Sequence, residues 1–310
     1  RMEKDRLHTS KTSAWKWVPS LYFAEGLPYV AVITIAVIMY KRLGLSNTEI
    51  ALYTSWLYLP WTIKPLWSPF VDLLKTKRWW IITMQALIGA AMAGIAFFIP
   101  THFYVQASLA FFWLMAFSSA THDISADGFY MLGLSEGEQS FFVGIRNTFY
   151  RFANIFGQGI LVMIAGWIEQ RSGNIPLAWS LVFYFMAGLF IALTLYHSYI
   201  LPRPINDTKT EAVNGKGLWE NFLKTFISFF KKEHIGLMLF FLLTYRLGEA
   251  QLVKIASPFL LDTSSAGGLG MSTTSVGFIY GTIGVIGLLL GGIVSGILVS
   301  RHGFKRWLLP

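Results

Sequence analysis

Seven charged side chains fall well inside long apolar stretches of the sequence. They are the acids Glu25, Asp123, Asp127 and Glu249 and the bases Arg151, Arg246 and Lys254. One isolated charge at the centre of a lipid bilayer costs about 2.5–3.5 kcal/mol, so seven unpaired charges would cost on the order of 20 kcal/mol. Most proteins have a net stability of only about 5–15 kcal/mol. If these stretches cross a bilayer, the charges must face one another or water, and the one excess acid can carry an exchangeable proton.

Two of the acids, Asp123 and Asp127, are four residues apart and therefore share one face of a helix. Two carboxylates at this spacing, away from bulk water, repel each other. One should then hold a proton more tightly than a free side chain does, unless a cation intervenes. The pair predicts a proton-coupling or substrate-binding site. The alternative is that both carboxylates pair with Arg151 on the next helix and only hold the two helices together.

A polar stripe follows on the next apolar stretch. Its members recur at spacings of 4, 3 and 4 residues: Asn147, Arg151, Asn154 and Gln158. This spacing places all of them on one helix face, which lipid cannot satisfy, so the stripe must face a cavity or another helix. A guanidinium suits two-pronged recognition of a carboxylate or a phosphate. We expect the stripe to line a substrate cavity; hydrogen bonding between helices is the alternative.

The other charges inside apolar stretches have weaker local signals. Arg246 and Glu249 are one turn apart and could satisfy each other or face the substrate cavity. Lys254 has no acid near it, which favours a position facing the cavity. Glu25 precedes Pro28, whose missing N–H should loosen the helix. An acid beside a loosened turn fits either a transport pathway or a capped kink.

His122 lies next to Asp123, which invites a metal or proton-relay interpretation. Successive residues of a helix point about 100° apart, so these two side chains cannot share a face. No second histidine is near it in the sequence, and the chain has no cysteine. We therefore expect no metal site, no thiolate chemistry and no disulfide scaffold.

Two further features concern helix packing and gating. Gly277 and Gly281 are four residues apart, a spacing that predicts close approach of a neighbouring helix. Asp72 and Arg78 flank a short charged loop between two apolar stretches. We expect both to belong to a gate on the cytoplasmic side.

The elements that must position these residues follow from the composition. Of the 310 residues, 54% are apolar and 13% are charged, whereas soluble proteins carry about 25% charged residues. A soluble enzyme and a disordered chain are both excluded, and an all-α, polytopic membrane protein is predicted. The apolar runs cover roughly residues 18–40, 48–67, 79–99, 103–131, 141–168, 177–201, 234–261 and 274–300.

Most basic residues fall on one side of these predicted helices. Of the 25 lysines and arginines, 19 lie in the first 16 residues, at 64–78, at 146, at 203–232 and at 301–306. The positive-inside rule then predicts a cytoplasmic amino terminus and the cytoplasmic (inner) membrane as the location. The basic residues that give the chain its net charge of +9 lie next to the inner leaflet of the membrane, so we expect no nucleic-acid partner.

The chain predicts a duplicated architecture. The segment Gly44-Leu45-Ser46-Asn47-Thr48 is similar to Gly270-Met271-Ser272-Thr273-Thr274, and Lys77-Arg78-Trp79 reappears as Lys305-Arg306-Trp307. We divide the chain into a six-helix bundle (1–201), a cytoplasmic linker with an amphipathic surface helix (202–233) and the start of a second bundle (234–310). We expect the chain to be truncated after about eight transmembrane helices.

Four short motifs are spread over residues 67–250. They are Trp67-Ser68-Pro69-Phe70-Val71-Asp72, Thr121-His122-Asp123-Ile124-Ser125-Ala126-Asp127-Gly128, Tyr150-Arg151 and Tyr245-Arg246-Leu247-Gly248-Glu249-Ala250. Together they resemble the AmpG-type permeases and the related acetyl-coenzyme A transporters of the major facilitator superfamily. The chain departs from that pattern at His122, where the family has Gln, and at Arg246 and Glu249, where it has Lys and Asp.

The resemblance implies a major facilitator fold and proton-coupled import of muropeptides, which are amino sugars carrying an anhydromuramyl peptide. Composition and spacing alone support only a proton-coupled transporter of a polar solute. An acyl-coenzyme A transporter, another sugar or peptide transporter and, more distantly, an integral-membrane acyltransferase are the alternatives. As a transporter the protein is no enzyme, needs no cofactor and works as a monomer in the bilayer, with a small solute and protons as partners.

Overall fold

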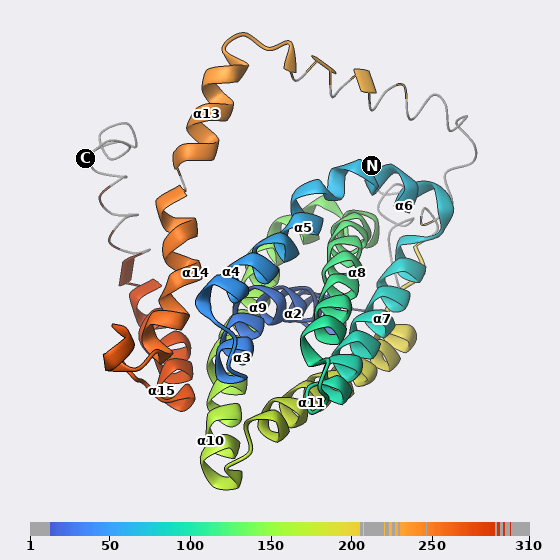
Figure 1. Ribbon diagram of the computed structural model, residues 1–310. Coiled ribbons are helices and arrows are strands. Elements are labelled where there is room, and N and C mark those ends of the chain that lie inside the picture. The colour runs from blue at the N-terminus through green and yellow to red at the C-terminus, as the bar shows by residue number, and fades with distance from the viewer. Residues whose placement is uncertain are drawn as a thin grey trace, which may run out of the picture.

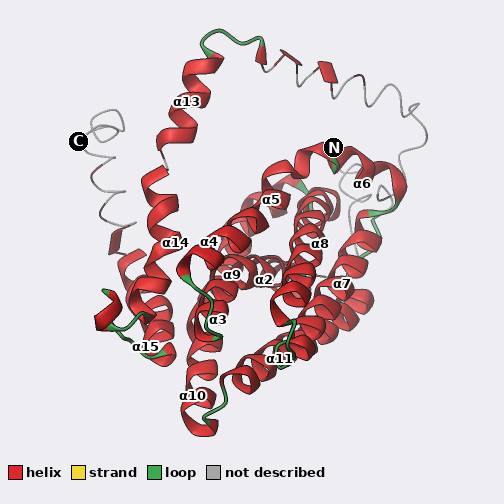
Figure 2. Ribbon diagram, viewed as in Figure 1, coloured by secondary structure: helices red, strands yellow, loops and turns green. Residues whose placement is uncertain are grey.

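The structure is a computed structural model in which helix is the regular secondary structure of every described segment (Figure 2). It describes residues 13–204, 207, 220, 223–224, 227–228, 230–245, 247–288, 290–291, 294 and 298, without the side chains of 72–73 and 242–243. The prediction of an all-α protein is confirmed. Most of the predicted surface helix in 202–233 lies outside the described residues.

The helices of the first bundle follow the predicted apolar runs to within a few residues. They are α2 (Val18–Val30), α3 (Ala36–Arg42), α4 (Asn47–Ser55), α5 (Leu59–Ile63), α6 (Ser68–Leu74), α7 (Lys77–Phe98), α8 (Tyr104–Gly133), α9 (Glu136–Ile155), α10 (Val162–Ser172) and α11 (Ile175–Ile200). Polar residues define several starts. Ser46 and Ser135 form capping boxes with the glutamates three residues later.

The first predicted span is one long helical run with a π-helical segment inside it. That segment, η2 (Ala31–Ile35), joins α2 to α3 and begins three residues after Pro28. Proline removes one backbone donor and so loosens the ladder of hydrogen bonds, as the sequence predicts. A second π segment, η5 (Phe156–Leu161), joins α9 to α10 in the same way.

The second predicted span is broken into short pieces. Between α4 and α6 the chain passes through the 3₁₀ turns Trp56–Tyr58 and Lys64–Leu66, and α5, the second of these turns and α6 each have proline in the first two positions. Proline fits a first helical turn but cannot continue the preceding helix. The irregular backbone that results can lie within the hydrocarbon region of a membrane only where protein or a water-filled cavity surrounds it.

Close packing holds α2 at the centre of the first bundle, between α8 and α9 (Figure 1). A Cβ added at Gly26 would lie 2.7 Å from the carbonyl oxygen of Tyr150, so only glycine lets α2 approach α9 this closely. On the other side of the bundle α7 packs against α8 and α11.

The second half contributes α13 (Ile235–Tyr245), α14 (Leu247–Leu261), α15 (Thr273–Phe278) and the π segment η7 (Ile279–Ile283). α14 packs against α3 and α4, and α15 packs against α10 and η5. α13 extends away from the first bundle (Figure 1), and its Phe240 is 66% exposed.

Two ends of the molecule are used below as reference. The basic end carries the amino-terminal ends of α2 and α7 and the carboxyl end of α11. The far end carries the carboxyl ends of α3, α10 and α14 and the start of α15 (Figure 1). Four helical runs in the described residues are long and apolar enough to cross a membrane: Ala14–Arg42, Lys77–Phe98, Glu136–Ser172 and Ile175–Ile200.

Candidate substrate and proton site

Three carboxylates and two cations meet where α2, α8 and α9 pack together. The acids are Glu25 on α2 and Asp123 and Asp127 on α8. The cations are Arg146 on α9 and Lys64 in the 3₁₀ turn before α6. We call these five residues the acidic cluster. Its charged groups carry a formal charge of −1 when all are ionised.

Asp123 is the deeper of the two aspartates, with 8% of its surface exposed. Its Oδ2 lies 3.6 Å from Nζ of Lys64. Its Oδ1 is buried and accepts no hydrogen bond in the described part of the chain. A buried acceptor without a donor is costly, by about 1–3 kcal/mol, so this atom can take a donor from a solute or a proton.

Asp127 lies closer to solvent and is held from two sides. Nη1 of Arg146 lies 3.2 Å from Oδ1 of Asp127, and the hydroxyl of Tyr22 donates to the same oxygen at 3.1 Å. The guanidinium also stacks over the rings of Tyr22 and Tyr130, 4.7 and 5.0 Å from their centroids. These contacts fix Arg146 in place and neutralise Asp127.

Glu25 is the acid without a cation of its own. It is 9% exposed, forms no ion pair with the described residues, and its Oε2 is buried without a hydrogen-bond partner. Its nearest charges include both aspartates as well as Arg146 and Lys64. Because Lys64 and Arg146 are already engaged by Asp123 and Asp127, Glu25 is the acid of the cluster that no described cation neutralises.

Aromatic side chains border the acidic cluster. The ring of Tyr29 packs edge-on against Trp61 and Tyr58, with centroids 5.3 and 6.3 Å apart. Nε1 of Trp61 lies close to Asp123 but does not complete a hydrogen bond, and Oδ1 of Asn154 is buried without a partner among the described residues. These unsatisfied atoms, like those of the two deep acids, can bind polar groups of a solute.

The alternative interpretation, in which both aspartates pair with Arg151, is wrong. Arg151 is exposed and forms no ion pair in the described part of the chain, whereas Lys64 and Arg146 hold the two acids. The positive-inside pattern assigns both cations to the cytoplasmic side. Both also lie inside predicted helices, 48–67 and 141–168, and this position is the signal that identifies them as candidates for the site.

The remaining predicted cavity residues are only partly brought to the cluster. Asn147 is exposed, and Gln158 is half-buried within η5. On α14, Nζ of Lys254 donates to the carbonyl and hydroxyl oxygens of Thr54, both at 3.4 Å, so it links the second half to α4. Glu249 is exposed on the same helix. Arg246 lies outside the described residues.

His122 faces away from the acidic cluster, but it is not isolated from other histidines. Nε2 of His122 lies 2.9 Å from Nε2 of Gln85, and Oε1 of Gln85 lies 2.9 Å from Nδ1 of His197, which in turn contacts Ser20. Both histidines and the glutamine are fully buried. His197 is distant from His122 in the sequence but is linked to it through Gln85, and the chain of hydrogen bonds ties α2, α7, α8 and α11 together.

The basic end is fastened within the first bundle. The backbone N–H groups of Lys77 and Arg78 donate to the carboxylate of Asp207, at 2.7 and 3.1 Å, so a residue of the predicted linker caps α7. The Arg78 guanidinium donates to the carbonyl oxygens of Ser198 and Leu201 at the end of α11. Asp72 belongs to α6, and its side chain is not among those described.

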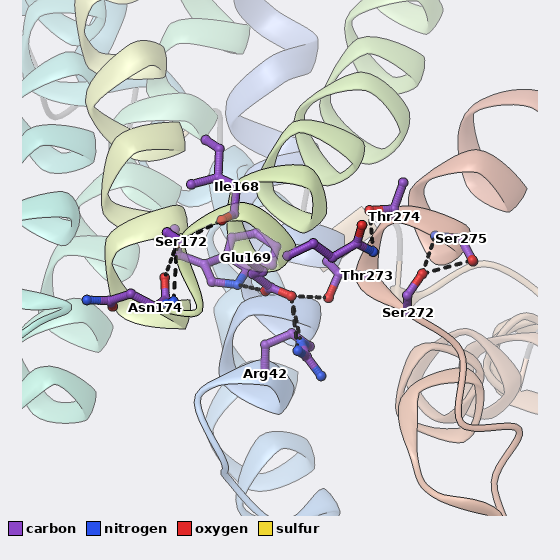
Figure 3. A network of polar contacts seen from close by, with 11 residues as sticks. Arg42, Ile168, Glu169, Ser172, Asn174, Ser272, Thr273, Thr274 and Ser275 are labelled. Atoms are coloured by element: carbon purple, nitrogen blue, oxygen red, sulfur yellow. Dashed lines mark hydrogen bonds and ion pairs between the residues drawn. The ribbon is translucent and has the colours of Figure 1, made fainter.

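At the far end, polar contacts join the two halves. Glu169 of α10 lies between Arg42 of α3 and Thr273 of α15 (Figure 3), with Oε2 3.0 Å from Nη2 of Arg42 and 2.7 Å from the donating hydroxyl of Thr273. A second link joins Lys41 to Asp262 at 2.5 Å. Sequence reasoning did not identify either link.

Comparison with known proteins identifies the family. The family model described as Major Facilitator Superfamily matches residues 20–310. The chain is 26% identical over 305 residues to "Putative transporter AmpG 4" of Rickettsia conorii and 27% identical over 302 residues to "Anhydromuropeptide permease" of Escherichia coli K12. Each alignment covers 93% of this chain, which spans 68% and 56% of those two relatives. The chain belongs to the Major Facilitator Superfamily, and within it the chain is similar to AmpG-type permeases.

Proposed function

We propose that the chain is part of a proton-coupled permease that imports a muropeptide-like solute, an amino sugar carrying a peptide, across the cytoplasmic membrane. In this proposal the amino terminus and the 202–233 linker are cytoplasmic, and the bundles 1–201 and 234–310 face each other across the solute pathway. The anhydromuropeptide permease of Escherichia coli supplies the substrate class by similarity.

The proposed coupling to protons rests on one observation. The acidic cluster holds three buried or half-buried carboxylates against two cations, and Glu25 is the acid left without an ion pair in the described residues. An ionised carboxylate in an apolar interior costs several kcal/mol unless it is paired, so protonation is the cheapest way to neutralise it. Glu25 is therefore the group we assign to the transported proton, with Asp123 next to it.

The same charges bear on the competing substrates. A highly anionic solute such as an acyl-coenzyme A would need a cationic site, and here the two cations are occupied by Asp123 and Asp127. The unsatisfied oxygens of Glu25, Asp123 and Asn154 are acceptors for the hydroxyl and amide donors of a sugar or peptide. The unsatisfied Nε of Arg146 and Nε1 of Trp61 are donors for its carbonyl groups. A muropeptide-like solute, which carries both kinds of group, fits this mixed pattern better than a highly anionic one.

Uptake by the full-length protein reconstituted in liposomes tests the proposal. We expect labelled anhydromuramyl peptide to accumulate only with a pH gradient that is acidic outside, and unlabelled muropeptide to compete. Short peptides, simple sugars and acyl-coenzyme A serve as parallel substrates. Accumulation of acyl-coenzyme A in preference to muropeptide would contradict the proposed substrate. Uptake of muropeptide to the same level without a pH gradient would contradict the proposed coupling to protons.

A further inference from the structure

We infer that three aromatic rings beside the acidic cluster form a subsite that binds the ring of an N-acetylated amino sugar. The rings belong to Tyr29 on α2, to Tyr58 at the end of the 3₁₀ turn before α5, and to Trp61 on α5. We call these three residues the aromatic platform. The inference rests on the proposed transport of a muropeptide-like solute, and it assigns one part of that solute to one part of the site.

Each ring of the aromatic platform contacts the other two. Tyr29 packs edge-on against Tyr58 and Trp61, and the rings of Tyr58 and Trp61 are tilted by 33° with centroids 6.4 Å apart. Tyr58 and Trp61 are three residues apart in a helical stretch, so they project from the same side of it. Tyr58 is 47% exposed, and the other two are half-buried. The described residues therefore leave part of this aromatic surface uncovered.

The breaks in the second predicted span position two of these rings. Pro60 lies inside α5 and Pro65 in the 3₁₀ turn after it, so α5 stays short and turns Trp61 towards α8. Gly26 positions the third ring, because its close contact with the carbonyl oxygen of Tyr150 holds α2 against α9. Tyr29 follows one turn later on the same side of α2.

Unsatisfied polar atoms lie along one edge of the platform. Nε1 of Trp61 is buried and has no acceptor among the described residues. Oδ1 of Asp123, which lies close to Trp61, and Oε2 of the neighbouring Glu25 are buried without a donor in the same part of the chain. The site thus combines an apolar aromatic face with one donor and two acceptors at its edge.

An N-acetylated sugar has the matching surfaces. The C–H groups of a pyranose ring form an apolar face, and their slightly positive hydrogens suit the negative face of an aromatic ring. The sugar hydroxyls can donate to carboxylate oxygens, and the acetamide carbonyl can accept from one N–H. A peptide backbone offers similar polar groups but no broad C–H face. An aromatic cluster that served only for packing would gain nothing from a buried N–H without an acceptor.

Binding of two disaccharides to the full-length protein in detergent tests the subsite without any gradient. N,N′-diacetylchitobiose carries acetamide groups where cellobiose has hydroxyls. Saturation-transfer NMR, with the aromatic protons of the protein irradiated, measures each affinity and identifies the sugar C–H groups that contact rings. We expect the parent to prefer diacetylchitobiose. Trp61→Leu and Tyr58→Ala should each weaken its binding about tenfold, through loss of a stacked ring.

Trp61→Phe separates the two roles of the tryptophan, because it keeps an aromatic ring and removes the N–H. It should bind cellobiose within about twofold of the parent and lose the preference for diacetylchitobiose. Trp167→Leu is the matched control, since Trp167 lies on α10 and its ring contacts Arg171. This variant should bind both sugars as the parent does.

Three results would overturn the subsite. They are equal affinity of the parent for the two sugars, no saturation transfer from aromatic protons to either sugar, and parent-like binding of diacetylchitobiose by folded Tyr58→Ala and Trp61→Leu. Since the assay involves no transport, any of them would leave proton-coupled import standing. A failed uptake assay would in turn leave the measured sugar binding standing.

Discussion

Replacing Glu25 with glutamine should separate transport from its driving force. The amide keeps the size and shape of the side chain but cannot release a proton. Glu25 is 9% exposed and has no ion pair among the described residues, so the neutral side chain disturbs no partner. We expect the Glu25→Gln variant to exchange solute across the membrane but not to accumulate it.

The expected size of the effect follows from the coupling. One proton moving down a gradient of one pH unit supplies about 1.4 kcal/mol, which is a tenfold concentration ratio. With one proton per solute, a gradient of two units supports an accumulation ratio of about 100 in the parent. The variant should equilibrate at a ratio of about 1 at every gradient.

Stability should move in the opposite direction from activity. An unpaired carboxylate at Glu25 carries a desolvation penalty whenever it is ionised, and the amide avoids it, so we expect the variant to be as stable as the parent or more stable, by about 1–2 kcal/mol. Thermal unfolding in detergent measures this, with Glu49→Gln as the exposed control. Accumulation by Glu25→Gln at more than twice the external concentration, in folded protein, would refute the assignment of the proton to Glu25.

Three other predictions concern packing, the buried network and pH. Gly281→Leu should prevent the halves from closing, because its Cβ alone would lie 2.7 Å from Cα of Gly159; we expect loss of uptake and constant labelling of a cavity cysteine from outside. Gln85→Leu leaves two fully buried histidines without their bridging amide, and should lower the free energy of unfolding by about 2–4 kcal/mol, measured by thermal or denaturant unfolding. The pKa of Asp262 is lowered in the folded state, so its link is complete above the ordinary aspartate pKa of about 3.9. It should be lost as pH falls through the lower folded-state pKa. The labelling rate of a cavity cysteine from outside, divided by the rate of a fully exposed reference cysteine at the same pH, should therefore stay constant between pH 5 and 8 and rise only in stronger acid.

The helices and the shared face of Asp123 and Asp127 could be predicted from sequence, because apolar run length and helical spacing act along one segment. The side chain of another helix that lies opposite Asp123 and Asp127 could not be predicted in this way. Arg146 and Arg151 are five residues apart, so they point about 140° away from each other around the helix. Only one of them can face α8, and nothing in the spacing of α9 says which.

Breaks in helices limited the prediction further. Lys64 reaches Asp123 because prolines divide the second span into short pieces whose rotation no regular period describes. The links of Glu169 with Arg42 and Thr273, and of Asp262 with Lys41, join residues from four separate segments that a single helix pattern does not relate. The motifs that resemble the AmpG-type permeases indicated the family correctly, because a motif is recognised from the order of its residues and needs no knowledge of how the helices pack.

The most direct test of the central claim is solute-driven proton movement in liposomes that hold the full-length protein and a pH-sensitive dye. With no initial pH gradient, adding anhydromuramyl peptide outside should acidify the interior, in proportion to the peptide that enters. Glu25→Gln should admit the peptide without acidification. Entry of the peptide with no change of internal pH in the parent protein would contradict proton-coupled import.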